Sequence, residues 1–246
     1  MSRIILPLLI SLPTACYLLF SCSDQRDVRD YYFPVRELTN GLVYAYENTG
    51  SLPGPDREYW YYLGVDLDTA LHLSVTRYSP AMAPEQQGRE EIRNDGVYLR
   101  DLTLLTTDSS GIATSAQATI LYDRVFPFYL APEATEAYGY RLHLRPPENP
   151  DATTYVTLNR RFRGDTSITV LGEAYPAIVF DLDGEVSLRD PEEGDISPQF
   201  IGYEIYARGL GLAAFERDLG NGNSLGGRLV ERIPMADFAE AMLPKD

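Results

Sequence analysis

The stretch from Gln87 to Thr106, QGREEIRNDGVYLRDLTLLT, decides the fold class of this chain. Two candidate strands, 87–93 and 97–106, flank Asn94-Asp95-Gly96, a cluster of residue types that adopt positive φ angles readily. Such a cluster between two extended segments is typical of a tight turn that joins antiparallel strands. The sequence therefore predicts a β-hairpin here.

Alternation of apolar and polar residues recurs on both sides of this hairpin at intervals of about ten residues, as expected for half-buried strands. Leu71, Leu73 and Val75 form the apolar face of one such segment, and the residues between them face water. The strands that we predict cover residues 42–47, 57–66, 71–76, 87–93, 97–106, 112–123, 138–144, 153–162, 166–171, 177–182, 185–189, 199–208, 212–218 and 228–233.

Glycine and proline mark the expected breaks between these strands. A turn at Asp183-Gly184 separates two of them, and a proline-bearing loop over 126–128 interrupts another pair. No helix is expected after Gly209 and Gly211, so these two glycines do not indicate a phosphate-binding loop. We predict instead that they permit a tight strand reversal or a bulge.

The helical period is confined to the C-terminus, where Met235, Phe238, Ala239 and Met242 share one helix face. The chain has 246 residues, of which 44% are hydrophobic and 23% charged, as in globular proteins. We predict an all-β fold: a single curved antiparallel sheet that forms a partly open barrel, with a short C-terminal helix. A β-sandwich is the alternative. One domain, residues 31–246, accounts for the folded part.

The beginning of the chain has the pattern of a secretion signal, because Arg3 precedes a short, proline-interrupted apolar run. The run ends in Leu19-Phe20-Ser21-Cys22, which resembles the lipobox of bacterial lipoproteins. We therefore predict a signal peptide over 1–21, a lipidated Cys22, and a tether over 22–30. A cleaved signal that leaves a free thiol, or an uncleaved anchor, is the alternative. The serine after the cysteine implies outer-membrane placement, by resemblance to enterobacterial sorting.

The charge balance restricts the possible partners. The chain carries 36 acidic and 21 basic residues, a net charge of −15. Nucleic acids are excluded, because affinity for them comes mainly from Lys and Arg that neutralise phosphates. The cysteines are Cys16 and Cys22, so the predicted domain has no thiol for a disulfide, a zinc site or catalysis. The partners that remain are the membrane, through the lipid anchor, and a hydrophobic small molecule, a glycan or an envelope protein.

An aromatic cluster is the candidate binding site. Tyr59, Trp60, Tyr61 and Tyr62 follow one another on a predicted strand, so Tyr59 and Tyr61 lie on one face and Trp60 and Tyr62 on the other. One pair could line a cavity for an apolar or amphipathic ligand, and a flat exposed row would suit sugars. Aromatic residues are also favoured in strands for packing alone, so core or sheet surface is the stronger interpretation of the cluster.

The residues that could carry catalysis do not form a recognised pattern. His72 and His143 are far apart in sequence, and the chain has no Gly-x-Ser-x-Gly, His-Glu-x-x-His or Cys-x-x-Cys motif. Asp181 and Asp183 share a strand face, but they match neither a defined glycosidase spacing nor a calcium loop. We therefore expect no catalytic residue, no metal site and no cofactor.

Short motifs give the chain a family resemblance. Tyr32-Phe33-Pro34, then 41–46 (GLVYAY), 172–180 (GEAYPAIVF) and 206–212 (YARGLGL) resemble envelope lipoproteins of Bacteroidota without an assigned activity. They are also similar to the TapB and DUF3108 groups, whose sheet is thought to form an open barrel as in the carriers LolA and LolB. The resemblance implies an open-barrel fold and supplies no catalytic residue.

Three functional hypotheses follow. The first is a non-enzymatic, lipid-anchored protein of the cell envelope that binds a hydrophobic ligand or a protein partner through the open side of its sheet. The second is a surface lipoprotein that binds or cleaves glycans with Trp60 and the neighbouring tyrosines as stacking platforms. The third is a structural subunit of an envelope assembly.

Overall fold

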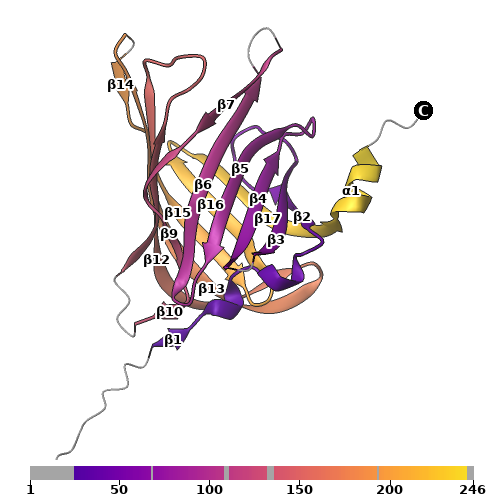
Figure 1. Ribbon diagram of the computed structural model, residues 1–246. Coiled ribbons are helices and arrows are strands. Elements are labelled where there is room, and N and C mark those ends of the chain that lie inside the picture. The colour runs from indigo at the N-terminus through magenta and orange to yellow at the C-terminus, as the bar shows by residue number, and fades with distance from the viewer. Residues whose placement is uncertain (1–24, 68, 108–110, 132–135, 193, 243–246) are drawn as a thin grey trace, which may run out of the picture.

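The sheet of this protein curves into a nearly closed barrel (Figure 1). The structure is a computed structural model that describes residues 25–67, 69–107, 111–131, 136–192 and 194–242. Within these ranges, 15 strands join into one antiparallel sheet, and a short helix follows the last strand. The predicted all-β fold, with one curved sheet and a C-terminal helix, is confirmed, and the sandwich alternative is wrong. Cys22 and the leader lie outside the described residues.

The strands follow one another along the chain mostly as neighbours in space. They are β2 (Leu42–Asn48), β3 (Arg57–Leu67), β4 (Ala70–Tyr78), β5 (Pro84–Ile92), β6 (Gly96–Thr107), β7 (Ala113–Gln117), β8 (Thr119–Tyr122), β9 (Arg124–Pro127), β11 (Ala137–Leu144), β12 (Thr153–Val170), β13 (Glu173–Asp190), β14 (Gly194–Ile196), β15 (Gln199–Ala207), β16 (Gly211–Gly220) and β17 (Asn223–Pro234). The order across the sheet is β7-β6-β5-β4-β3-β2-β17-β16-β15-β13-β12-β11-β8; in addition, β14 pairs with β13 and β9 with β6.

The two ends of this strand order meet, and their meeting closes the barrel. β7 pairs with β6 and β8 pairs with β11, although only Ala118 separates β7 from β8 in the chain. The Ala118 N–H donates to the carbonyl oxygen of Leu102 at 2.8 Å, so the link itself is held to β6. One segment thus bridges the first and last thirds of the sheet, which brings its two edges together.

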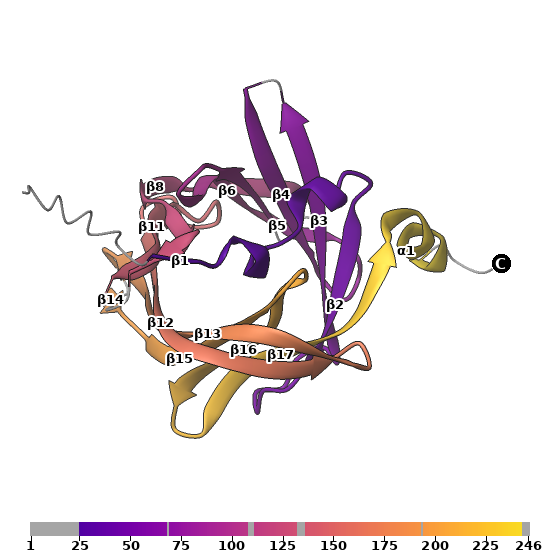
Figure 2. The same cartoon turned by 90° about the horizontal axis from the view of Figure 1, so that it is seen from below.

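The N-terminal segment closes one end of the barrel. It consists of β1 (Arg26–Asp27), which pairs with β10 (Tyr129–Leu130), and two short 3₁₀ helices, η1 (Arg29–Tyr31) and η2 (Val35–Glu37). Figure 2 shows this segment lying across the ring of strands. Its apolar side chains are buried, and Val28 and Leu38 have no exposed surface. We call residues 28–38 the floor.

The folded part begins before the boundary that the sequence suggests. The predicted tether ends at Asp30 and the predicted domain begins at Tyr31, yet Arg26 already pairs with Leu130 in the sheet formed by β1 and β10. Apolar burial of Val28 and Tyr31 explains this, because both side chains complete the packing of the barrel end.

Three motifs far apart in sequence meet at the floor. The Phe33 ring stacks on Tyr62, with 4.3 Å between ring centroids, and also contacts Tyr44. The Tyr44 hydroxyl donates to the Leu210 carbonyl oxygen at 3.1 Å. Two residues further along β2, on the same face of the strand, the Tyr46 hydroxyl donates to the carbonyl oxygen of Leu212 at 2.9 Å. The start of the chain, β2 and the β15–β16 turn are therefore held together by buried contacts.

Glycines in the strands and turns permit close approach. Gly209 and Gly211 form the β15–β16 reversal with φ angles of 75° and 90°, as predicted. Gly96 begins β6 without a positive φ; instead, a Cβ there would lie 2.6 Å from the Phe126 carbonyl oxygen on β9. The hairpin of β5 and β6 is confirmed, but its glycine serves close packing.

Three predicted breaks are wrong. The loop expected over 126–128 is partly strand, because Phe126 and Pro127 belong to β9 and pair with β6. Asp183-Gly184 is not a turn, because β13 runs through it without interruption, and a Cβ on Gly184 would overlap the Phe200 ring on β15. The glycine is therefore required by a neighbouring ring, which local sequence does not reveal. β12 likewise runs from Thr153 to Val170, with a register shift between Phe162 and Gly164 where we expected two strands.

The C-terminal helix α1 (Met235–Met242) follows Pro234 directly, as predicted. Its Phe238 ring packs on the outward-facing rings of Tyr59 and Tyr78, at centroid distances of 5.2 and 6.2 Å. The helix therefore covers the outer face of β3 and β4. Among the described residues, no helix is long and apolar enough to cross a membrane.

Gly211→Ala tests the floor contact. A Cβ at Gly211 would lie 2.5 Å from the Phe33 ring, whereas one at Gly209 has nothing within 4 Å. Both residues have positive φ, so alanine costs roughly 1–2 kcal/mol of backbone strain at either position. Overlap with Phe33 adds roughly 1–3 kcal/mol at Gly211 only. Urea unfolding of the two variants measures the difference, and equal destabilisation would show that Phe33 does not pack there.

Candidate functional site

The inner face of the barrel is filled near the floor and exposed to solvent toward the opposite end. Large inner side chains near the floor are buried, among them Tyr44, Tyr62 and Phe180. At the far ends of β13 and β17, Val186 and Leu225 face inward by register and are 37% and 42% exposed. Partly exposed apolar side chains continue this wall, namely Trp60, Leu102, Leu104, Tyr140 and Val156. We call this inner surface the open end.

Trp60 is the aromatic residue of the predicted cluster that faces the open end. Its register partners are Tyr44 on β2 and Arg77 on β4. The Trp60 Nε1–H donates to Glu58 at 3.2 Å, and the Arg77 guanidinium carbon lies 5.7 Å from the centre of the indole. Arg77 also lies 3.6 Å from Glu58. The indole is thus fixed between a carboxylate and a cation, with apolar wall beside it.

The other three residues of the predicted cluster have packing partners. Tyr59 and Tyr61 face outward and Trp60 and Tyr62 inward, as the alternation predicts. Tyr59 lies under Phe238 of α1, and the Tyr61 ring lies against Gly41. Tyr62 is 3% exposed and stacks on Phe33. The structure therefore divides the four side chains between two faces and leaves no shared exposed row.

A charged pair is buried in the barrel wall. The Arg160 Nε–H donates to Glu204 at 2.6 Å, and Glu204 also accepts from the Tyr206 hydroxyl at 2.9 Å. The Glu204 side chain is 2% exposed and that of Arg160 11%. Burial raises the pKa of Glu204, but Arg160, together with Arg217 and the Tyr206 hydroxyl, outweighs burial and holds that pKa below its ordinary value. The ionised pair is the stable form.

A second carboxylate, Glu90, faces the interior from β5 and accepts a hydrogen bond from the Tyr32 hydroxyl of the floor. Burial raises the pKa of Glu90, and the Tyr32 and Arg160 side chains oppose this shift only in part. Glu90 and Glu204 thus have opposite pKa shifts within one barrel, because only Glu204 has a guanidinium in direct contact.

Sequence reasoning missed these interior charges. Arg160, Glu204 and Glu90 occupy inward positions of strands that alternate imperfectly, so each reads as a surface residue. A usable signal exists in one case: Glu204 lies between Tyr203 and Ile205, and its neighbours two positions away are Gly202 and Tyr206. An apolar strand face with one carboxylate in it indicates a buried ion pair whose partner the sequence does not name.

The remaining candidate residues are dispersed. His72 and His143 belong to β4 and β11, and each alternates with inward-facing apolar residues, so both face outward. Asp181 and Asp183 are paired with Arg163 and Arg161 on the outer surface. Within the described ranges, no group of three or more His, Cys, Asp or Glu side chains is arranged to hold a metal ion.

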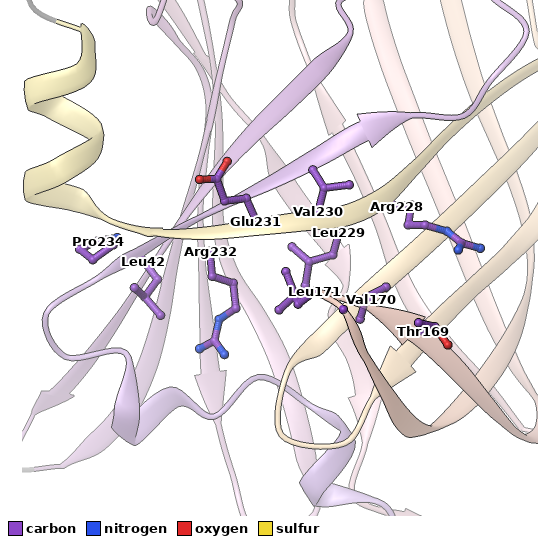
Figure 3. A pocket seen from close by; sticks show the side chains of 11 residues that line it. Leu42, Thr169, Val170, Leu171, Arg228, Leu229, Val230, Glu231, Arg232 and Pro234 are labelled. Carbon is purple, nitrogen blue, oxygen red and sulfur yellow. The ribbon is translucent and has the colours of Figure 1, made fainter.

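A separate hollow of about 770 Å³ lies beside β17 (Figure 3). Its walls are β17 from Arg228 to Arg232, the hairpin tip at 169–172, Leu42 and Pro234. β17 has a bulge between Leu229 and Glu231, where it pairs with β2. A bulge adds one residue to the strand and bends it locally, and this bulge lies in the wall of the hollow.

Two solved structures are similar to this chain, and the first of them shows the fold. A "putative lipoprotein" from Parabacteroides distasonis ATCC 8503 matches over 81% of this chain and 95% of its own, with 13% identity and a TM-score of 0.50. A "putative exported protein with YmcC-like fold" from Bacteroides fragilis NCTC 9343 matches over 78% of this chain and 95% of its own, with 11% identity and a TM-score of 0.45.

At 13% identity the first of these matches shows the fold alone. No protein-family model matches the chain. No curated protein matches it either. The resemblance to the TapB and DUF3108 groups therefore stays a prediction.

Glu204→Gln tests the buried pair. The substitution leaves Arg160 buried without its counter-charge, so we expect a loss of roughly 3–5 kcal/mol in unfolding free energy at pH 7. Asp183→Asn, which removes a surface partner of Arg161, is the matched control and should cost less than about 1 kcal/mol. Equal losses in chemical denaturation would contradict the assignment of Glu204 as the structural partner of a buried cation.

Glu90→Gln tests the second carboxylate through pH. The pKa of Glu90 is higher in the folded than in the unfolded state, so its ionisation destabilises the fold as pH rises above about 4.3. Glutamine removes this penalty and can still accept from Tyr32. We expect the variant to gain stability relative to the parent as pH rises from 4 to 7. Thermal unfolding midpoints of both proteins across this pH range measure the gain. A difference between the two midpoints that stays constant with pH would contradict the raised pKa of Glu90.

Proposed function

We propose that this protein is a non-enzymatic, lipid-anchored component of the bacterial cell envelope, attached to the outer membrane through Cys22. In this proposal it binds a hydrophobic small molecule at the open end of its barrel. The observation that carries the proposal is the solvent-exposed apolar wall at one end of a barrel whose other end is sealed.

The position of the floor supports an orientation toward the membrane. Cys22 precedes Gln25, the first described residue, by three positions, so extended chain spans at most about 11 Å between them. β1 then begins at Arg26 beside the floor. A lipid on Cys22 would therefore hold the floor next to the bilayer, and the open end would face away from it. Likeness in fold to a "putative lipoprotein" agrees with an envelope location.

The chemistry of the open end supports a hydrophobic ligand. Val186 and Leu225 are exposed large aliphatic side chains on an inward face, and burial of such surface by a ligand is favourable at roughly 25 cal/mol per Å². Trp60 adds a flat aromatic surface whose polar atoms already have partners. A glycan platform is less well supported, since the aromatic cluster forms no exposed row.

A protein partner is the second candidate. Ile196 and Ile201, on β14 and β15, are 60% and 64% exposed, and Ile112 beside β7 is 62% exposed. Cover by another protein would remove this apolar surface from water, which is favourable at roughly 25 cal/mol per Å². A carrier would transfer its ligand through such a contact.

Quenching of Trp60 fluorescence tests ligand binding at the open end. Trp60 is the chain's single tryptophan, so an uncharged brominated lipid, 1-(9,10-dibromostearoyl)glycerol, reports contact with this residue alone. We expect saturable quenching of the full-length protein in non-ionic micelles, because the indole faces the exposed apolar wall.

The control moves the tryptophan to the opposite face of β3. In the double variant Y59W/W60F the indole lies on the outer face, under Phe238. Micelle insertion alone would quench both proteins equally. Such equality, or no saturable quenching of Trp60, would contradict the proposal.

A further inference from the structure

The hollow beside β17 holds a cation that has no carboxylate partner at ion-pair distance among the described residues. Arginines of the described residues without a carboxylate at ion-pair distance are Arg141, Arg145, Arg189, Arg208, Arg228 and Arg232. All are exposed except Arg232, which is half-buried. In a chain with 36 acidic residues, a shielded arginine without a carboxylate partner is unexpected.

The surroundings of Arg232 hold its position. The guanidinium carbon lies 5.1 Å from the centre of the Tyr44 ring, so the cation rests against a fixed aromatic face. The Arg232 Nε is buried and has no hydrogen-bond partner. Glu231 points to the other side of the strand, where it pairs with Arg57 at 3.3 Å (Figure 3). The Arg232 side chain is therefore held at the wall of the hollow, with its Nε unsatisfied and its guanidinium beside Tyr44.

The rest of the lining is mostly apolar, with Thr169, Arg228 and Glu231 as its other polar residues. Leu42, Leu229 and Val230 line the hollow from β2 and β17, and Val170 and Leu171 line it from the tip of the β12–β13 hairpin. A guanidinium beside aliphatic walls matches a molecule with an anionic head and a hydrocarbon chain. The hollow, at about 770 Å³, has the volume of a small-molecule site.

Leu171 occupies this wall despite an unfavourable backbone. Its φ is 54°, a region that leucine adopts at a cost and that asparagine tolerates. The β16–β17 turn has Asn221 at φ 56° before Gly222, and the β12–β13 turn has Leu171 before Gly172. The chain therefore uses the favourable residue in one hairpin and an apolar residue in the hairpin that lines the hollow.

We propose that this hollow binds the carboxylate of a single-chain fatty acid through Arg232, with the hydrocarbon chain against Leu171 and Leu229. The net charge of −15 opposes multiply charged anions, so a monoanion fits best. The site is distinct from the open end, because the buried Tyr44 ring lies between Arg232 and Trp60 in the register of β17, β2 and β3.

The test is a titration of the full-length protein in non-ionic micelles with [1-¹³C]dodecanoate, followed by carboxyl NMR. We expect a bound resonance whose carboxyl pKa lies below that of dodecanoate in empty micelles, because the guanidinium favours the ionised form. Arg232→Gln should weaken binding about tenfold, the loss of one charge-assisted pair. Arg145→Gln makes the same charge change at an exposed position away from the hollow and should bind like the parent.

A second variant and a neutral competitor complete the test. Leu171→Asn removes an apolar wall at a backbone position that suits asparagine, so it should weaken dodecanoate binding, while relief of backbone strain offsets part of the core packing that Leu171 loses. Dodecanol should not displace dodecanoate. Absence of binding to the parent, a loss below threefold in Arg232→Gln, or equal competition by dodecanol would overturn the proposal. Quenching of Trp60 by the uncharged brominated lipid should be unchanged in Arg232→Gln, which separates this site from the open end.

Discussion

The packing of Phe33 against Tyr44, Tyr62 and the bare backbone at Gly211 is the contact on which the rest of this structure depends. It brings together the floor, two neighbouring strands and a distant turn. A barrel has two ends, and this contact fixes the floor in one of them. The inner face consequently differs along its length, packed beside the floor and solvent-exposed at the far ends of β13 and β17.

Sealing one end also sets the electrostatics of the interior. Glu204 and Arg160 lie where water is excluded, so their mutual attraction is strong and each needs the other. Glu90 has only the Tyr32 hydroxyl of the floor in direct contact, and its ionised form is penalised. Such charges restrict the register of the strands that carry them, because a one-residue slip would place them on the outer face or leave them unpaired.

Local sequence predicted what depends on local chemistry. Alternation gave the strands, the spacing of Phe238 gave the C-terminal helix, and the glycines at 209 and 211 gave a turn. Local sequence did not predict features that depend on a distant residue. Gly184 was expected in a turn, but it lies within β13, and a glycine is required there because the Phe200 ring lies over it. The interior charges escaped for the same reason, since nothing near Arg160 in sequence names Glu204. For the aromatic cluster, alternation correctly predicted which side chains share a strand face. The contact of Tyr59 with the C-terminal helix and the position of Trp60 at the open end depend on the fold.

The account requires a barrel with one sealed end, because both the proposed orientation on the membrane and the proposed ligand site depend on it. Hydrogen–deuterium exchange tests this most directly at the amides that tie the floor to the barrel: Val28 to Phe128, Gly64 to Leu38, and Gly209 to Asp30. Protection of these amides close to that of β2 and β16 is the predicted result. Exchange of these three at the rate of unstructured peptide, while the strands remain protected, would contradict the account.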